Sequence, residues 1–567
     1  MGNNSSPPTD NTLHLPQEHD ADGELMATTT MSRSNDPVEK SVPCKTGKVV
    51  PVIFIPGIMG TNLMNMKTKK RVWVAPNIDG VFPVVKTVGV LLGSWFKSAK
   101  QRQAELDSTP GAVGIYEDGE VEDAGCGLAE KELRIRKWGS IMRSAYHPIM
   151  GEMQRQMNSI MLASDLQGDW KARVEQAPSD WGDWEENPSL SSLGNDASGL
   201  KIAAETQYEV WAAGYNWLQS NQDSARDVIK YIKNTVLPHY KGKAERVLIV
   251  THSMGGLVAR AMVKCHAFSE LYGVVHGAMP ATGAPASYKR VRAGFEALAE
   301  KKILGRDAAD AVAVMAFAAG PLELLPTRDY NNAQPWLFVR DNTTAKKMLD
   351  LPKSCPYEEI YKSDKWWGLI PENNDKLLDP AGLVSNREKG SPKWSGVDSE
   401  PKSLRNVFDD VINGVQVFHA KIEEGYYKET YVHYSAESKS PDLYTWGNIE
   451  WAAKSLAGLN VESAKLTGDN LDAKVQLNGM YSLEIGAKHY PGDGTVPAFS
   501  SSAPRGKKEV KAAFAHGQNS DGLNQYCKIG QFNNSKGYGH QDAYTDKSGR
   551  TLFATLYSLV RLSTSIS

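Results

Sequence analysis

A serine at the tip of a predicted turn is the residue of this chain best suited to nucleophilic chemistry. An apolar run ends at Thr251-His-Ser-Met-Gly255, and residues with helical spacing follow. Where a strand turns sharply into a helix, the two approach closely, so small residues must flank the nucleophile. Gly255 meets this need, and Thr251 stands where a second glycine is usual. The pattern indicates that Ser253 is held in a strained turn rather than in an ordinary loop.

A hydroxyl is a weak nucleophile unless a base and an orienting acid support it. The turn around Ser253 resembles the nucleophile elbow of α/β-hydrolases, in which an acid and then a histidine follow the serine along the chain. Asp493 lies in a tight Gly-Asp-Gly turn, and His540 lies in a glycine-rich loop before the last helical pattern. His516 is the competing base, but His540 fits the motif order better. We predict a triad of Ser253, Asp493 and His540.

Two backbone amides are expected to stabilise the oxyanion that forms when a serine attacks an ester. The residue after the nucleophile usually gives one of them, which selects Met254, and a loop after an early strand gives the other. The apolar run Val50–Ile55 predicts such a strand, and it leads into Pro56-Gly-Ile-Met-Gly60, whose glycines permit an open turn. We predict Ile58 as the second donor, with Met59 as the alternative.

Several segments resemble the motifs of known lipases. Gly214-Tyr-Asn-Trp-Leu218 is similar to the Tyr-Asp-Trp-Arg segment of lipases related to lecithin:cholesterol acyltransferase, with Asn and Leu substituted. The serine region also resembles that of GPI inositol deacylases. The surroundings of His540 resemble those of bacterial lipases, which include type VI secretion effectors that attack the phospholipids of rival cells. The other segments that resemble the acyltransferase-related lipases are Pro56–Leu63, Thr251–Gly256 and Gly492–Pro497.

This resemblance implies a phospholipase A that works through an acyl-enzyme on Ser253 and releases a fatty acid. It also implies three partners: membrane phospholipids, an immunity protein that blocks the site, and a component of the secretion apparatus. Other functions stay open, namely an acyltransferase with the same triad, a small-ester or peptide hydrolase, and a non-catalytic hydrolase-fold binding protein. The sequence does not determine the head group, the ester position cleaved, the metal dependence or the oligomeric state.

Alternating strand and helix patterns predict an α/β-hydrolase fold with a mostly parallel central sheet and large cap insertions. Strands are expected at 50–55, near 208–213, at 246–250 and at 271–276, with a helix at 224–236 and a closing helix around 552–560. The predicted units are a disordered tail at 1–46, a first part of the core at 47–286 with an insertion at about 64–140, a cap at 287–478 and a second part of the core at 479–567.

Two apolar stretches fall short of the roughly 20 residues that a helix needs to span a bilayer. Phe82–Phe96 carries one lysine and follows the predicted oxyanion loop, so it is either buried core or a lid that docks on membranes. Ala311–Leu322 is rich in alanine, which favours a tightly packed helix.

The composition excludes several classes of function. The chain of 567 residues has a net charge of −2 and no basic run suited to nucleic acid. Its five cysteines are scattered without metal-ligand or redox spacing, and no cofactor is expected, although a calcium ion held by irregular Asp and Asn loops stays open. The polar start lacks the pattern of a signal peptide, which predicts synthesis in the cytoplasm and, for an effector, delivery into the periplasm of target cells.

Overall fold

The computed structural model describes most of the chain, in thirteen stretches. The segment Phe82–Phe96, predicted to be either buried core or a lid, lies outside them. The predicted tail contributes four strands of three residues each, β1 (Thr12–His14), β2 (Gln17–His19), β3 (Leu25–Ala27) and β4 (Glu39–Ser41). The described residues are 12–14, 17–19, 25–27, 39–41, 48–75, 97–162, 165–176, 191–295, 308–390, 402–468, 471–517, 537–545 and 549–566.

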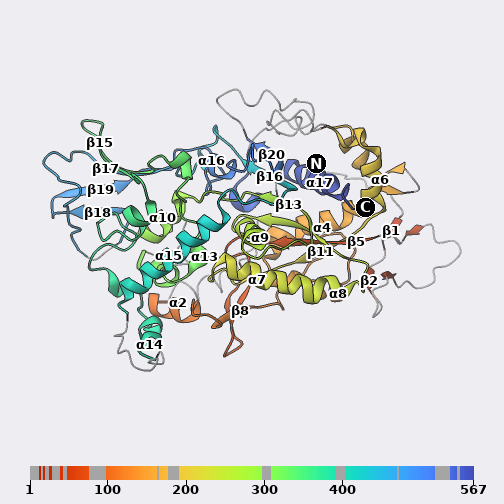
Figure 1. Cartoon of the computed structure of the whole chain (residues 1–567), viewed down its shortest axis with the longest axis horizontal. Coiled ribbons are helices and arrows are strands. Elements are labelled where there is room, and N and C mark those ends of the chain that lie inside the picture. The colour runs from red at the N-terminus through yellow and green to blue at the C-terminus, as the bar shows by residue number, and fades with distance from the viewer. Residues whose placement is uncertain are drawn as a thin grey trace, which may run out of the picture.

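A parallel sheet forms the centre of the molecule (Figure 1). In the described part of the chain it has six strands, in the order β11-β5-β12-β13-β16-β20, and every neighbouring pair is parallel. The predicted fold class, an α/β-hydrolase fold with a mostly parallel sheet, is therefore confirmed. The strands are β5 (Val49–Ile55), β11 (Gln207–Ala212), β12 (Val247–His252), β13 (Leu271–Gly277), β16 (Thr430–Ser435) and β20 (Val510–His516).

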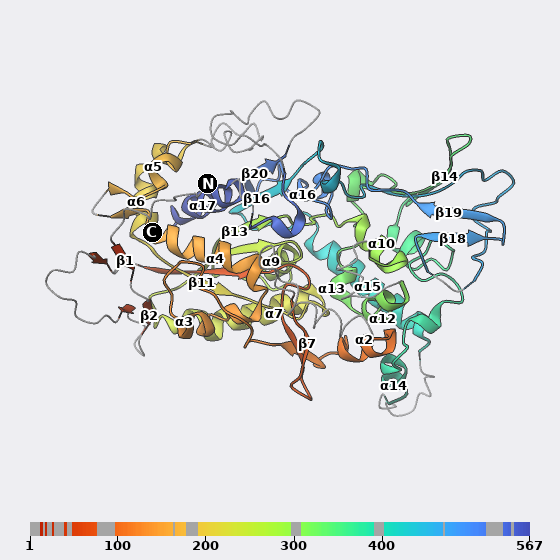
Figure 2. The ribbon, with the colours of Figure 1, turned by 180° about the vertical axis from the view of Figure 1, so that it is seen from behind.

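Alternate residues of these strands enter two separate apolar layers. Along β5, Val52 and Phe54 pack into one layer, whereas Ile53 and Ile55 pack into the other. Because both faces are covered by helices, a central strand reads as a continuous apolar run in the sequence. Figures 1 and 2 agree that the covering helices lie on opposite sides of the sheet. They are α4 (Arg143–Met157) and α17 (Arg550–Ser563) on one face, and α7 (Asn221–Tyr231) and α9 (Gly255–Lys264) on the other.

A second sheet lies at the far end of the molecule from the short N-terminal strands (Figure 1). Its order is β15-β14-β17-β19-β18, and its strands are β14 (Leu337–Asp341), β15 (Lys346–Leu351), β17 (Ile449–Ala453), β18 (Lys474–Leu477) and β19 (Tyr481–Ile485). The α-helices that the structure describes between β13 and β16 along the chain are α10 (Pro285–Ala293), α12 (Ala308–Met315), α13 (Ala319–Leu322), α14 (Leu383–Gly390) and α15 (Leu404–Ile422). Residues 311–322, expected to form one packed helix, lie mostly buried in two helices, α12 and α13, with a break at 316–318.

Short elements complete the described chain. A small antiparallel sheet joins β6 (Leu63–Asn65), β7 (Arg71–Trp73) and β8 (Val113–Ile115), and β9 (Met161–Leu162) pairs with β10 (Asp165–Leu166). The remaining α-helices are α2 (Ala99–Glu105), α3 (Glu130–Ile135), α5 (Trp170–Arg173), α6 (Ala197–Glu205), α8 (Leu237–His239) and α16 (Ala498–Ser501). Single turns are η1 (Trp138–Ser140), η3 (Leu193–Asn195), η4 (Ile232–Val236), η5 (Tyr330–Ala333), η6 (Tyr357–Tyr361), η7 (Asp375–Leu377), η8 (Pro441–Leu443) and η10 (His540–Asp542).

The structure differs from the predicted unit boundaries in two places. Strand β16 belongs to the central sheet, although it falls inside the segment 287–478 that was expected to be cap. Its sequence, Thr-Tyr-Val-His-Tyr-Ser, is completely buried yet lacks the apolar run that marks β5, β12 and β13. The second sheet also continues to Ile485, because β18 and β19 form a hairpin across the predicted boundary at 478.

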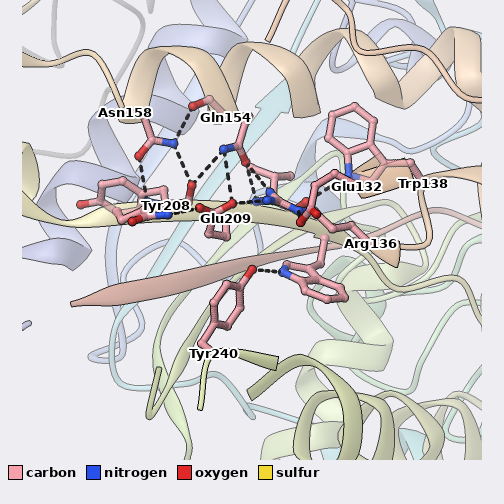
Figure 3. A network of polar contacts seen from close by, with 11 residues as sticks. Glu132, Arg136, Trp138, Gln154, Asn158, Tyr208, Glu209 and Tyr240 are labelled. Atoms are coloured by element: carbon pink, nitrogen blue, oxygen red, sulfur yellow. Dashed lines mark hydrogen bonds and ion pairs between the residues drawn. The ribbon is translucent and has the colours of Figure 1, made fainter. Parts of the chain in front are cut away.

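The outer edge of β11 is covered by side chains instead of a further strand (Figure 3). Asn158 donates from Nδ2 to the Tyr208 carbonyl at 2.7 Å, and its Oδ1 accepts the Tyr208 N–H at 2.9 Å. Gln154 Oε1 accepts the Val210 N–H at 2.8 Å, and Trp138 Nε1 donates to the Val210 carbonyl at 3.0 Å. An exposed strand edge invites pairing with another chain, and these side chains prevent it by satisfying the edge groups.

A fully buried arginine organises this edge cluster (Figure 3). Arg136 Nε lies 2.7 Å from Glu132 Oε1, Nη1 donates to Gln154 Oε1 at 3.0 Å, and Nη2 forms an ion pair with Glu209 on β11. Burial lowers the pKa of Arg136, but the charges of Glu209 and Glu132 outweigh it and raise the pKa above its ordinary value. The guanidinium therefore stays charged and paired within the protein.

Candidate active site

Ser253 occupies a strained turn directly after β12. Its φ of 51° lies in the left-handed region, which a non-glycine residue adopts only at a cost of about 1–3 kcal/mol. Its N–H donates to the Gly277 carbonyl at 2.9 Å, which anchors the turn to β13. A Cβ on Gly255 would lie 2.5 Å from the Ile55 carbonyl oxygen, so the start of α9 can pass this close to β5 only with glycine. Local sequence and close packing thus produce the predicted elbow geometry.

Thr251 fits the position where the motif usually has glycine. The residue is fully buried in β12, and its Oγ1 lies 2.9 Å from His276 Nδ1 on the neighbouring strand β13. The Tyr544 hydroxyl donates to its carbonyl at 2.8 Å. The larger side chain is accommodated because a polar partner satisfies its hydroxyl inside the sheet.

The structure brings Ser253, His540 and Asp493 into one line of polar contacts. His540 Nε2 lies 2.8 Å from Ser253 Oγ, and His540 Nδ1 lies 2.7 Å from Asp493 Oδ2. Because the carboxylate can only accept, Nδ1 carries the proton of the neutral ring and Nε2 accepts the serine hydroxyl. All three residues are at most 8% exposed. The arrangement can transfer a proton from the serine to the imidazole.

The loop between β19 and α16 fixes the carboxylate of Asp493. Asp493 Oδ1 accepts the N–H groups of Thr495 and Val496 at 2.9 and 2.7 Å. The Asp493 carbonyl accepts the His540 N–H at 2.8 Å, so acid and base are joined through both backbone and side chain. Ser435, at the end of β16, donates to the Gly492 carbonyl at 2.9 Å. The tight turn expected from the Gly-Asp-Gly sequence is therefore held from several sides.

His516, the alternative base, lies elsewhere. It ends β20, is fully buried, and neither ring nitrogen has a hydrogen-bond partner among the described residues. Its ring lies 6.1 Å from that of His433, measured between centroids. Burial, with smaller contributions from Arg550 and His433, holds the pKa of His516 well below its ordinary value. Of the two histidines, His540 is the one that contacts Ser253.

The loop that follows β5 is held so that the amides of Ile58 and Met59 remain available. The Tyr215 hydroxyl donates to the Pro56 carbonyl at 3.0 Å, and Trp73 Nε1 donates to the Met59 carbonyl at 2.8 Å. The amides of Ile58 and Met254 have no hydrogen-bond partner among the residues that the structure describes. The same holds for Met59, whose φ of 64° creates the bend in the loop. Both predicted donors are thus free to bind an oxyanion.

Two residues of the site have no counterpart in the expectations from sequence. Tyr146, on α4, contacts His252 Nδ1 through its hydroxyl at 2.9 Å, and the same oxygen accepts the Gly57 N–H at 3.2 Å. His252 Nε2 lies 2.9 Å from the His540 carbonyl oxygen. His252 stands beside the nucleophile and could have been suspected from that position. Tyr146 is 106 positions away, and no local pattern marks it.

Two further observations concern membranes and metals. Within the described ranges, every helix is too short or too polar to traverse a lipid bilayer. The same ranges contain no group of three or more His, Cys, Asp or Glu side chains arranged to hold a metal ion.

Comparisons with known proteins agree with this geometry. A family model described as a PGAP1-like alpha/beta domain matches residues 191–345, which include the serine turn. A chain from the crystal structure of the Tle4-Tli4 complex is similar over 92% of this chain and 100% of its own length, with 35% sequence identity and a TM-score of 0.77. No curated protein matches the sequence.

Proposed function

Since the chain belongs to the family of the type VI lipase effector Tle4, we propose that it is a serine phospholipase that cleaves a fatty-acyl ester. The observation that carries this proposal is the buried contact chain from Ser253 Oγ through His540 to Asp493, at 2.8 and 2.7 Å. A non-catalytic binding protein would have no need to keep a strained serine beside an imidazole and two unpartnered amides. These features together support ester chemistry.

The proposed reaction begins when Ser253 Oγ attacks the ester carbonyl and its proton passes to His540 Nε2. Asp493, on Nδ1, orients the ring and stabilises the imidazolium that forms. The amides of Met254 and Ile58 donate to the oxyanion. The C–O bond to the alcohol then breaks, and His540 protonates the departing oxygen. Water, deprotonated by His540, then attacks the acyl carbonyl. The bond to Ser253 Oγ breaks, His540 returns the proton to that oxygen, and the fatty acid is released.

Membrane phospholipids are the proposed substrate class, and the proposed setting is a target cell. The matched Tle4 is found in complex with Tli4. By analogy, we propose that an immunity protein binds this chain in the producing cell and blocks its site. We further propose synthesis in the cytoplasm, export with a component of the secretion apparatus, and action from the periplasm of the target cell.

Vesicles of defined phospholipid composition test the proposal. The purified protein should release free fatty acid together with lysophospholipid, and Ser253→Ala should abolish both products. Adding a long-chain alcohol separates hydrolysis from acyl transfer, because an acyltransferase would form the alcohol ester at the expense of free acid. If the protein hydrolyses soluble short-chain esters but leaves the vesicle lipids intact, the phospholipase assignment is contradicted. The protein would then be a small-ester hydrolase.

A further inference from the structure

A continuous chain of hydrogen bonds joins the oxyanion loop to the histidine base. Gly57 N lies 3.2 Å from the Tyr146 hydroxyl oxygen, that oxygen lies 2.9 Å from His252 Nδ1, and His252 Nε2 lies 2.9 Å from the His540 carbonyl oxygen. We propose that Tyr146 and His252, here called the brace, are positioning residues that hold both halves of the active site. This inference rests on the ester hydrolysis proposed above.

Only one arrangement of protons satisfies all three bonds of the brace. The His540 carbonyl can only accept, so His252 Nε2 carries a proton. Burial, and then the nearby His540, lowers the pKa of His252 to about 3, so the ring is neutral and Nδ1 has no proton. Nδ1 therefore accepts the Tyr146 O–H. The Tyr146 oxygen is left to accept the Gly57 N–H, which it contacts.

The neutrality of the brace matters because it lies next to the base. The rings of His252 and His540 are 5.1 Å apart between centroids. A positive charge on His252 would oppose protonation of His540 at the step where the serine proton is taken up. Burial raises the pKa of Tyr146, so its hydroxyl also keeps its proton at neutral pH. The brace stays uncharged while His540 gains and loses a proton.

Close packing fixes the loop against the brace. A Cβ on Gly57 would lie 2.9 Å from His252 Nδ1, and a Cβ on Gly60 would lie 2.8 Å from the Tyr146 hydroxyl oxygen. Both glycines are thus required by the same two side chains. The bond to the Gly57 N–H holds the peptide plane directly before the one that carries the Ile58 amide. Together with the packing of Gly57 on His252, it restricts the directions open to the Ile58 amide. The loss of the brace should misdirect this donor and loosen the base.

The brace does not touch the reacting atoms in the proposed mechanism, so its loss should lower kcat and leave KM almost unchanged. Misplacement of catalytic groups by about 1 Å costs up to roughly 100-fold in rate. For Tyr146→Phe we therefore expect a fall in kcat of about 10- to 100-fold on a soluble ester. A residue that only supported folding would instead lower the melting temperature and the active fraction.

Two substitutions of His252 separate the two ends of the brace. His252→Gln keeps a donor near the Nε2 position, towards His540, and loses the acceptor for Tyr146. His252→Asn keeps an acceptor near the Nδ1 position and loses the donor. Tyr544→Phe is the matched control, because Tyr544 is buried, its ring lies 6.0 Å from that of His252, and its hydroxyl donates to the Thr251 carbonyl outside the brace.

The experiment measures kcat, KM and melting temperature for the full chain and each variant, and the rate of Ser253 labelling by a fluorophosphonate. We expect kcat and the rate of fluorophosphonate labelling to fall in Tyr146→Phe, His252→Gln and His252→Asn. Both quantities should stay near wild type in Tyr544→Phe. Tyr146→Phe and His252→Gln break the same link, so the double variant should lose little more than either single variant.

The possible failures are distinguishable. If the brace variants keep kcat within about twofold of Tyr544→Phe, or lose only melting temperature, the brace is overturned and the proposed function stands. If the losses of kcat in Tyr146→Phe and His252→Gln add up in the double variant, the two residues do not act through one hydrogen bond, and the brace is also overturned. If the wild-type protein hydrolyses no ester and Ser253 is not labelled, the proposed function fails, and the brace fails with it.

Discussion

Two buried polar clusters lie at the central sheet. One covers the outer edge of β11, and the other lies at the carboxyl end of β12. In the edge cluster, charges are paired and backbone groups of the strand find side-chain partners, as Arg136 and Asn158 illustrate. In the cluster around Ser253, the amides of Ile58 and Met254 have no partner among the described residues. Satisfied groups hold a structure in place, whereas aligned but unsatisfied groups are available to a substrate.

The clusters also differ in how they use charge. The edge cluster keeps a guanidinium between two carboxylates inside the protein. The cluster around the serine places one carboxylate, Asp493, against His540 and keeps the neighbouring His252 neutral, since burial lowers the pKa of His252 to about 3. A positive charge on His252 would oppose protonation of His540. The comparison predicts that damage to the edge lowers stability, and that damage to the serine cluster lowers turnover.

The largest expected effect is on the nucleophile. Ser253→Ala should reduce ester turnover by about four to six orders of magnitude, because triad members act as a unit. The melting temperature should stay close to wild type, since the substitution removes one oxygen from a strained turn. Fatty acid release from vesicles and thermal unfolding measure the two quantities. Substantial lipase activity in a folded Ser253→Ala protein would contradict the assignment of the nucleophile.

His540 and His516 allow two buried histidines at the carboxyl end of the sheet to be compared directly. His540→Ala should lower turnover nearly as much as the loss of the serine, because it removes the group that contacts Ser253 Oγ at 2.8 Å. His516→Ala should be mild in turnover per folded molecule, because His516 makes no such contact. Kinetics corrected for the fraction of folded protein provide the test. The reverse pattern would identify His516 as the base.

Breaking the edge cluster should affect stability and spare the chemistry. Arg136→Met leaves Glu132 and Glu209 buried without their partner, which costs roughly 3–5 kcal/mol in the free energy of unfolding. Urea unfolding measures this loss. The triple variant Glu132→Gln, Arg136→Met, Glu209→Gln should recover much of it, because no charge is left unpaired. A strong fall in turnover of the folded Arg136→Met protein would show that the two clusters are coupled.

The smallest expected effect is a slope of stability against pH. Burial lowers the pKa of His433 to about 3. The rings of Tyr538, Tyr544 and His516 pack around it. Below the ordinary histidine pKa near 6.5, this histidine is protonated in the unfolded chain but stays neutral in the folded chain. The free energy of unfolding therefore falls as the pH is lowered from about 6.5 towards 3. His433→Asn should reduce this slope by up to about 1.4 kcal/mol per pH unit. An unchanged slope in urea unfolding between pH 7 and 5 would contradict the prediction.

Several features could be predicted because they are written in local sequence. The strands β5, β12 and β13 read as buried apolar segments, and the serine turn combines a strand, a small flanking residue and a helix. The order of serine, acid and histidine along the chain selected Asp493 and His540. The structure places these two side chains in contact.

Other features could not be predicted from the sequence because they depend on contacts between segments that lie far apart in the chain. Strand β16 contributes to the core through Tyr, Thr and His side chains, whose burial depends on neighbours and not on an apolar pattern. The cover over the edge of β11 comes from helix α4 and the segment before it, and each of its polar residues would look like an exposed surface residue in isolation.

The sequence by itself determined the fold class and the tight turn that carries Ser253, because periodic apolar residues and a sharp strand–helix turn are governed by short-range sterics and burial. Tertiary structure alone decided which polar groups became partners. Tyr146 reaches His252 across 106 positions, and the charge state of that histidine follows from its burial beside His540. Hydrogen bonding and desolvation depend on positions in space, and the chain fixes those positions only when it has folded.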